Sequence, residues 1–179
     1  MYLRIRYSLI VWSLLFAVGA FPQEANAQLE SIFGGGSKVS EIGTEELAKL
    51  LKEQQQAAAK ATAEGIAPTA KFVVVDVRSD AEVNVSIIPG AITKEEYERA
   101  PDKYANLLVI PYCTVGGRSG AYAKQLAAKG VKVKNYKGSI LEWVGAELPL
   151  VTLKGEPTNR VHTYSDRYRI PAKYEQVTQ

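Results

Sequence analysis

The stretch YCTVGGRSGAYAK, at residues 112–124, brings together residue types that can do chemistry. It holds the only cysteine of the chain, Cys113, followed after two residues by two glycines and an arginine. An apolar run precedes it and a helical pattern follows it, so the thiol is expected at the carboxyl end of a strand, where α/β sheets place ligand sites. Unpaired N–H groups at the start of a helix stabilise an anion there. We therefore predict that Cys113 is a nucleophile with a pKa below the free-thiol value of about 8.5.

The residues after Cys113 suit a loop that closes around an anion. Gly116 and Gly117 allow the backbone to curl so that several N–H groups converge on one point, and Arg118 adds a fixed positive charge at the rim. A lone cysteine is more often a small buried hydrophobic residue, which is the alternative role for Cys113. Its position, the glycines and the arginine together favour a functional thiol.

Other chemistries of cysteine loops fit the sequence less well. A phosphate-binding P-loop would need Gly-Lys-Ser or Gly-Lys-Thr after the glycines. A Cys-His hydrolase would need a base, but the only histidine, His162, lies in the last part of the chain and is expected at the surface. A dithiol oxidoreductase would need a second cysteine. A single cysteine and a single histidine do not form a recognisable metal-binding motif. We therefore predict neither a metal nor a cofactor.

The strands that must position this loop can be read from hydrophobic patterns. Runs rich in β-branched residues predict buried strands at 71–77, 107–112 and 131–136. Strands that alternate with helices predict an α/β fold with a parallel sheet covered by helices. Pro111 has no N–H to donate to a ladder, so the second strand is expected to end or bulge just before Cys113.

Two helices are predicted around these strands. Thr44 is expected to cap a helix that buries a face of leucines and continues to Gly65. A second helix follows the cysteine loop and ends at Gly130, because glycine is the usual residue just past a helix C-terminus.

Residues 1–27 have the pattern of a secretory signal peptide. Two arginines precede an apolar run at 9–21, and ANA at 25–27 supplies a small-x-small cleavage site. The apolar run is shorter than the roughly 20 residues that span a bilayer, so no stable membrane insertion is expected after cleavage. The chain is therefore predicted to be exported, with the periplasm as the expected compartment. Residues 28–38, with three consecutive glycines, are predicted to form a flexible lead-in.

Composition and charge limit the class of partner. With 179 residues, of which 46% are hydrophobic and 23% charged, the chain fits one globular domain. The net charge is +3, and removal of residues 1–27 lowers it to +2, which is too small and too evenly spread to indicate nucleic acid. Exported proteins normally pair their cysteines in disulfides, so a solitary thiol indicates a role other than stapling the fold.

The cysteine loop resembles that of a known family. Residues 113–119, CTVGGRS, are similar to the Cys-x-x-Gly-x-Arg-Ser active-site loop of rhodanese-like sulfurtransferases. On this resemblance we expect a rhodanese-like domain at 39–151 and a C-terminal extension at 152–179. Further segments similar to the family occur in its order: DVRSDAE at 76–82, IPGAI at 88–92, KGSILEW at 137–143 and LPLV at 148–151.

The resemblance implies a fold and a reaction. The fold has three layers, with a central five-stranded parallel sheet flanked by helices. Cys113 takes a sulfane sulfur from a small-molecule donor such as thiosulfate, carries it as a persulfide and passes it to a thiol or to cyanide, a cycle for which one thiol suffices. The loop residues would bind the substrate through their backbone amides: Thr114, Val115, Gly116, Gly117, Arg118 and Ser119.

The resemblance also implies supporting residues around the loop. Asp76, Arg78 and Glu82 are expected to act as scaffold, with Arg78 or Glu82 in a buried pair near the loop. Trp143 is expected in the core rather than at a ligand.

The chain departs from the family pattern at two places. Ser86 and Ile87 stand where the family usually has Gly-His. Thr114 and Val115 are uncharged where members specialised for thiosulfate often carry basic residues, so the physiological donor need not be thiosulfate.

Two other functions stay open. A non-catalytic rhodanese-like module would bind a partner or sense reactive sulfur through Cys113, although the presence of both Cys113 and Arg118 favours the enzyme. A phosphatase or arsenate reductase is less favoured, because four residues separate Cys113 from Arg118, one fewer than in the phosphatases of the same architecture.

Overall fold

The computed structural model describes residues 39–178. The predicted signal peptide, its cleavage site and the predicted lead-in at 28–38 all lie outside the described residues. The helices are α2 (Thr44–Ala63), α3 (Asp80–Val83), α4 (Lys94–Arg99), the 3-10 helix η1 (Pro101–Tyr104), α5 (Gly117–Ala128) and α6 (Ser139–Gly145). The strands are β1 (Ser40–Glu41), β2 (Phe72–Asp76), β3 (Ala91–Thr93), β4 (Leu108–Tyr112), β5 (Lys134–Asn135), β6 (Leu150–Val151), β7 (Pro157–Thr158), β8 (Arg160–His162) and β9 (Glu175–Val177).

Parallel strands form the centre of the fold. β2 lies between β3 and β4 in a three-stranded parallel sheet, and β1 pairs with β5 in a separate parallel sheet. An isolated parallel bridge between Val109 and Val133 is the link between these two sheets. The predicted α/β class with parallel strands is confirmed. The expected single five-stranded sheet is not found, because the strands form one sheet of three and one of two.

Pro111 explains where the sheet is interrupted. It lies within β4, opposite Val75, and the strand ends at Tyr112, so the prediction that it ends just before Cys113 is confirmed. Alternate residues of a strand direct their N–H groups to opposite neighbours. On the side of β4 that faces β5, Val109 N–H donates to Lys132 O at 2.9 Å. Pro111 faces the same side, because its carbonyl accepts from Tyr136 N–H at 3.0 Å. The missing donor therefore weakens the pairing of β4 with β5 and leaves that with β2 intact.

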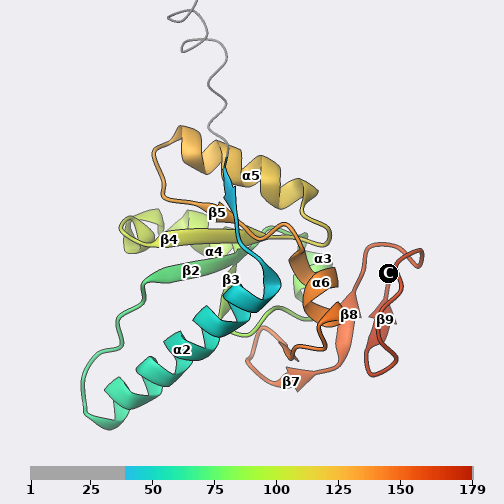
Figure 1. The fold of residues 1–179 in the computed structure, drawn as a ribbon, viewed down its shortest axis with the longest axis horizontal. Helices are drawn as coiled ribbons and strands as arrows, with labels where there is room; N and C mark the ends of the chain where they lie inside the picture. Colours follow the sequence, from blue (N-terminus) through green and yellow to red (C-terminus); the bar gives the residue numbers. More distant parts are fainter. Residues whose placement is uncertain (1–38, 179) are drawn as a thin grey trace, which may run out of the picture. The chain divides into compact units, whose positions relative to one another are not determined.

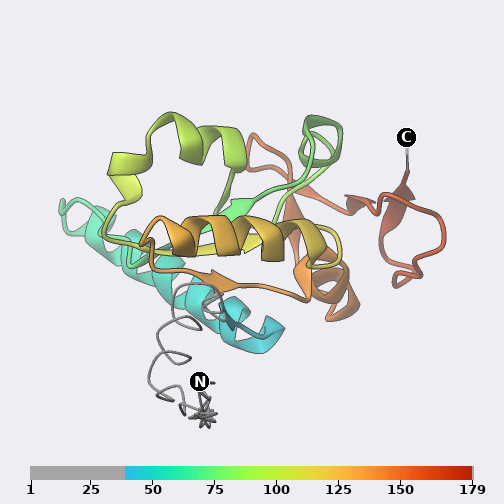
Figure 2. The same ribbon diagram turned by 90° about the horizontal axis from the view of Figure 1, so that it is seen from above.

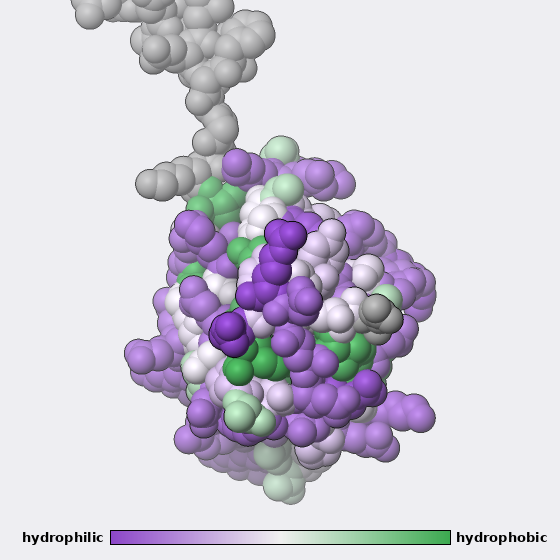
Figure 3. Space-filling view, turned by 90° about the vertical axis from the view of Figure 1, so that its right-hand side faces the viewer, coloured by the Kyte–Doolittle hydropathy of each residue, from purple (hydrophilic) through white to green (hydrophobic). Residues whose placement is uncertain are grey.

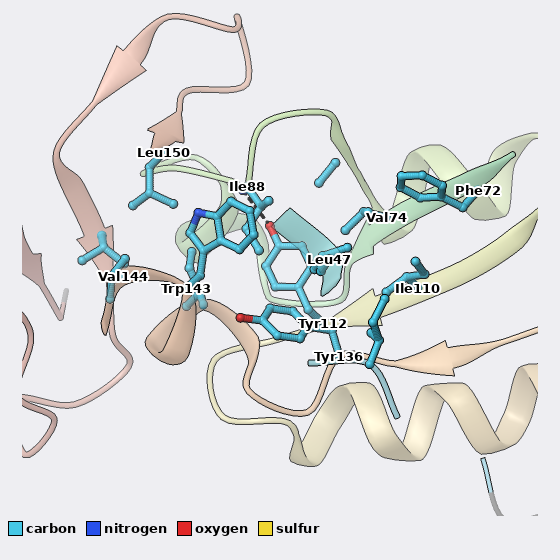
Figure 4. Close-up of a cluster of buried hydrophobic side chains, with 14 of the residues drawn as sticks. Leu47, Phe72, Val74, Ile88, Ile110, Tyr112, Tyr136, Trp143, Val144 and Leu150 are labelled. Atoms are coloured by element: carbon cyan, nitrogen blue, oxygen red, sulfur yellow. Dashed lines mark hydrogen bonds between the residues drawn. The ribbon is translucent and has the colours of Figure 1, made fainter. Parts of the chain in front are cut away.

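Helices cover both faces of the central sheet, as Figures 1 and 2 show for α2 and α5. β2 is buried along its whole length, and its alternate residues enter two hydrophobic clusters. Phe72 and Val74 pack into the cluster that also holds Leu47 of α2 and Trp143 of α6 (Figure 4). The second cluster joins the opposite face of the sheet to α4, η1 and α5. Trp143 is therefore a core residue, as predicted.

The start of α2 differs from the prediction. Gly43 occupies the N-cap position and Thr44 is the first helical residue, so Thr44 does not cap the helix. Its hydroxyl instead lies 2.9 Å from the hydroxyl of Tyr136. The predicted leucine face is confirmed, since Leu47 is fully buried and the neighbouring leucines pack against the same cluster.

The residues after Val151 pack into the same core. β6 pairs with β7 in an antiparallel ladder, and β8 pairs with β9 in a parallel one. Val161 and Tyr174 both belong to the cluster that contains Trp143. β8 and β9 lie on the same side of the molecule as α6 (Figure 1). Among residues 39–178, no helix combines the length and apolar character needed to cross a bilayer.

A buried ion pair ties the end of β2 to two other segments. Arg78 Nη2 lies 2.7 Å from Asp76 Oδ2, and both side chains are fully buried. The guanidinium also donates to Ser86 O at 2.6 Å and to His162 O at 3.5 Å. Burial alone would lower the pKa of Arg78, but the Asp76 carboxylate raises it overall, so the guanidinium stays charged. Asp76 and Arg78, which were expected to act as scaffold, thus form a buried pair at the end of β2.

Replacing Arg78 by alanine is expected to lower the free energy of unfolding by about 3–5 kcal/mol, because it leaves the Asp76 charge buried without a partner. The matched control is Arg99→Ala, which removes an exposed pair with Glu95 and should cost less than about 1 kcal/mol. Urea unfolding of both variants measures the difference. Equal losses in the two variants would contradict a structural role for the buried pair.

Candidate active site

Cys113 lies directly after β4, between the starts of two helices. The residue is 1% exposed. Ile140 and Leu141, in the first turn of α6, donate their N–H groups to the carbonyls of Cys113 and Thr114 at 3.1 and 3.3 Å. The first N–H groups of a helix have no partner within it, so these two bonds satisfy α6 and fix the backbone of the loop at the same time.

The backbone of the loop curls around the sulfur. Gly116 N–H donates to Cys113 Sγ at 3.1 Å. Gly116 has φ = 89° at the N-cap of α5, and a Cβ on it would lie 2.3 Å from Lys137 O, so only glycine fits there. By contrast, a Cβ on Gly117 would meet no atom within 4 Å. The two glycines predicted to shape the loop are therefore not equivalent.

The pKa of Cys113 reflects two opposing effects. Burial of the thiol raises the pKa, but N–H groups of Ser119, Val115 and Gly116 and the hydroxyl of Ser119 stabilise the thiolate. The net result is a pKa below the ordinary thiol value, in the predicted direction. Ser119 is fully buried, and its hydroxyl also lies 3.2 Å from Gly116 O.

Arg118 is held by Glu82 on the neighbouring helix α3. Its Nη1 and Nη2 lie 2.7 Å from the two carboxylate oxygens of Glu82, and Nη2 also donates to Thr114 Oγ1 at 2.9 Å. The Thr114 hydroxyl donates to Glu82 Oε1 at 2.8 Å. Arg118 was expected to place a positive charge at the rim. In the structure this charge pairs with Glu82, and the pKa of Arg118 is raised by its hydrogen bonds to Glu82 and also by its interaction with Cys113. The side chains of Thr114 and Arg118 therefore brace the loop.

Glu82 is the centre of this brace. Its side chain is 3% exposed, and it also accepts from the N–H and hydroxyl of Ser79 at 3.0 and 2.8 Å. Burial alone would raise the pKa of Glu82, but the hydrogen bonds from Arg118, Ser79 and Thr114 hold it well below its usual range. Glu82 is thus ionised at neutral pH and fixes α3 to the loop.

Sequence reasoning missed Ser139. This residue is fully buried and has φ = 55°, a conformation that costs a non-glycine residue on the order of 1 kcal/mol. Its hydroxyl accepts from Cys113 N–H at 3.0 Å, donates to Tyr136 O at 3.0 Å and lies 3.8 Å from Cys113 Sγ. A serine between a glycine and an apolar helix is too common a pattern to single out from sequence.

Sequence reasoning also missed Tyr164 of the C-terminal extension. Its ring centroid lies 5.9 Å from the guanidinium carbon of Arg118, and the residue is 70% exposed with φ = 66°. Its N–H donates to Nδ1 of His162 at 3.1 Å. His162 is buried, so the expectation that it lies at the surface is wrong. The reason is that β8 packs against the domain core through the adjacent Val161.

Ser86 and Ile87, which stand where the family usually has Gly-His, have structural roles. Ser86 is fully buried, and its carbonyl accepts from Arg78. Ile87 is also buried and exchanges two backbone hydrogen bonds with Val151, at 2.7 and 3.0 Å. These residues therefore anchor the segment before β3 and bring no ionisable side chain to the loop.

The arrangement can hold a sulfur anion and present it to a small molecule. Val115, in the middle of the loop, is 48% exposed. Figure 3 shows the face on the side of α6 and β8, where hydrophobic patches lie among hydrophilic residues. Within residues 39–178, no three His, Cys, Asp or Glu side chains are grouped so that they could hold a metal ion. The chemistry that the described residues support is nucleophilic attack by sulfur.

The alkylation rate of Cys113 plotted against pH should have its midpoint below that of a free thiol. Ser139→Ala should raise this midpoint by about one unit, because it removes a hydroxyl that can turn toward the thiolate. Ser139→Gly should raise it equally while unfolding at higher urea than Ser139→Ala, because glycine relieves the positive φ. A wild-type midpoint equal to that of a free thiol, or midpoints unchanged in both variants, would refute the assigned roles.

Comparisons with known proteins identify the family. No curated protein matches the chain. Among solved structures, a protein from Bacillus halodurans is similar at 19% identity, with 76% of this chain and 89% of that chain covered and a TM-score of 0.47. A rhodanese-related protein from Thermoplasma volcanium is similar at 21% identity, with 63% of this chain and 97% of that chain covered and a TM-score of 0.46. A protein from Staphylococcus saprophyticus is similar at 28% identity, with 59% of this chain and 93% of that chain covered and a TM-score of 0.42. The model of the rhodanese-like domain matches residues 45–146, more than half of the sequence. The chain therefore belongs to the rhodanese-like domain family.

Proposed function

We propose that the protein is a sulfurtransferase that carries sulfane sulfur as a persulfide on Cys113. The observation that carries this proposal is the position of Cys113 Sγ in a curled loop, 3.1 Å from the N–H of Gly116. Backbone N–H groups aimed at sulfur stabilise a negative charge without needing a side-chain base. The family assignment supports a protein of the sulfurtransferase type.

The proposed cycle has two displacement steps on sulfur. In the first, the Cys113 thiolate attacks the sulfane sulfur of the donor, and the leaving group departs with the electron pair of the broken S–S bond. With thiosulfate as donor, the leaving group is sulfite. In the second, a thiolate or cyanide attacks the outer sulfur of the persulfide, and the Cys113 thiolate is regenerated. In each step one bond to the transferred sulfur breaks as another forms, and the oxidation state of that sulfur is preserved. The cycle therefore needs no external oxidant or cofactor.

The proposed roles of the other residues follow from their contacts. The N–H groups from Val115 to Ser119 would stabilise the outer sulfur of the persulfide as its charge develops. Arg118, Glu82 and Thr114 would act as positioning residues, because they contact one another and hold the loop. Asp76 and Arg78 would support the same edge of the sheet from below the site.

A second candidate is a non-catalytic module that binds a partner protein. The exposed side chains of Val115 and Tyr164 near the loop favour it, since exposed apolar and aromatic residues are common at interfaces. A phosphatase is less well supported. The arginine that would have to bind phosphate, Arg118, already has its charge paired with Glu82.

Cys113→Ser should abolish sulfur transfer to cyanide, because it removes the atom that forms the persulfide with little change in side-chain volume. Arg118→Ala should retain the nucleophile but leave Glu82 buried without its partner, so we expect a loss of about 10-fold to 100-fold. Thiocyanate formation from thiosulfate, mercaptopyruvate and organic persulfides measures both variants, with Arg99→Ala as an exposed control.

Circular dichroism of each variant shows whether the fold is intact. Wild-type activity in Cys113→Ser would end the catalytic proposal. If the wild type transfers sulfur from none of these donors, the partner-binding module takes its place.

A further inference from the structure

Tyr164 combines an exposed side chain with an unfavourable backbone conformation. The residue is 70% exposed, and its φ of 66° lies in the left-handed region, where a bulky residue is strained. Glycine would adopt the same conformation without strain. Burial does not offset this strain, because most of the side chain remains in water. A compensating role is therefore expected in what the side chain contacts.

The Tyr164 ring contacts Arg118 of the cysteine loop. The ring centroid lies 5.9 Å from the guanidinium carbon, within the range of a cation–π interaction. The two terminal nitrogens of the same guanidinium lie 2.7 Å from the carboxylate oxygens of Glu82. Glu82 thus fixes the guanidinium through its N–H groups, and the Tyr164 ring meets it from a second direction.

The segment that carries Tyr164 is held by hydrogen bonds on both sides of the residue. Tyr164 N–H donates to His162 Nδ1 at 3.1 Å. Gln176 Nε2, from β9, donates to Thr163 Oγ1 at 2.7 Å and to Ser165 O at 3.1 Å. The C-terminal extension therefore presents the ring at a fixed place beside the loop.

Arg118 connects this ring to the sulfur. Glu82 raises the pKa of Arg118 most, and Cys113 raises it further, so the guanidinium interacts with the sulfur. The interaction is reciprocal, because a positive charge near a thiol favours the thiolate. The Arg118 side chain is 43% exposed, and holding it in one place costs rotamer entropy. A ring packed against the guanidinium limits its movement and its contact with water, which strengthens its effect on the sulfur.

We propose that Tyr164 is a positioning residue of the site, whose ring holds the Arg118 guanidinium beside the sulfur of Cys113. This inference rests on the proposed function, in which Cys113 is the reacting group. It gives the C-terminal extension a part in the site, since Tyr164 lies outside residues 45–146, which match the family model. Tyr164 acts through Arg118 and changes the stability of the sulfur anion.

The test measures the stability of the thiolate directly, as the midpoint of the Cys113 alkylation rate plotted against pH. Tyr164→Gly should raise this midpoint by about half a unit, because Arg118 loses the ring and is more freely solvated. Tyr164→Phe keeps the ring and should leave the midpoint within about 0.1 unit of the wild type. Under the proposed function, Tyr164→Gly should also load sulfur about threefold more slowly.

A double-mutant cycle shows whether the effect passes through Arg118. Adding Tyr164→Gly to Arg118→Ala should move the midpoint by less than about 0.1 unit, because the guanidinium is already absent. An equal shift with and without Arg118 would overturn the inference, as would an unchanged midpoint in Tyr164→Gly alone.

Urea unfolding separates positioning from a structural role. Tyr164→Gly should unfold at the same urea concentration as the wild type or higher, because glycine relieves the left-handed φ. The matched control is Glu147→Gly, which relieves a φ of 58° just after α6, where Glu147 pairs with the exposed Lys173. This control should leave the alkylation midpoint unchanged.

The outcomes distinguish this inference from the proposed function. Unfolding of Tyr164→Gly at clearly lower urea than the wild type would show that the ring serves the fold, and would contradict the inference. If the midpoints shift as expected but the wild type loads no sulfur from any donor, the sulfurtransferase function fails and the positioning role of Tyr164 stands.

Discussion

The donation of backbone N–H groups to Cys113 Sγ is the constraint on which the rest of the site depends. A buried sulfur anion is costly unless donors replace the water that it has lost. The loop meets this need with main-chain groups, and Gly116 is the residue that directs them, since its φ of 89° and its approach to Lys137 O leave no room for a side chain. α6 then holds the far side of the loop through the carbonyls of Cys113 and Thr114.

Two carboxylates keep the surrounding arginines in place. Asp76 fixes Arg78 beneath the sheet edge, and Glu82 fixes Arg118 at the loop. The two pairs differ in exposure, because Arg78 is fully buried whereas Arg118 is 43% exposed. The first pair therefore contributes mainly to the fold. The second braces the cysteine loop, since Glu82 and Arg118 both bond to the Thr114 hydroxyl.

Much of this arrangement could be predicted from the sequence where the signals are local. β2 is a continuous run of buried residues, and Cys113 with Gly116 follows a strand and opens a helix, so both the strand and the loop were expected. The five-stranded sheet was not found as such. Its interruption depends on which edge of β4 faces β5, and a proline in a sequence does not reveal that direction. Arg118 was recognised, but its pairing with Glu82 decides its electrostatic role.

The residues that sequence reasoning missed or misplaced depend on contacts between distant segments. Ser139 reaches Cys113 from the start of α6, and its positive φ is visible only in the folded chain. Tyr164 lies near Arg118, and His162 is buried beside it, because Val161 packs into the core, which no local pattern indicates.

The central claim is that the curl of the backbone at Gly116 stabilises the sulfur anion. The most direct measurement is the rate of sulfur loading on Cys113 in Gly116→Ala, with Gly117→Ala as the matched control. Alanine at 116 would carry a strained φ and a Cβ against Lys137 O, whereas position 117 has open space. We expect Gly116→Ala to lose about 100-fold or more and Gly117→Ala to stay within about threefold of the wild type. Loading of Gly116→Ala at the wild-type rate would contradict the account.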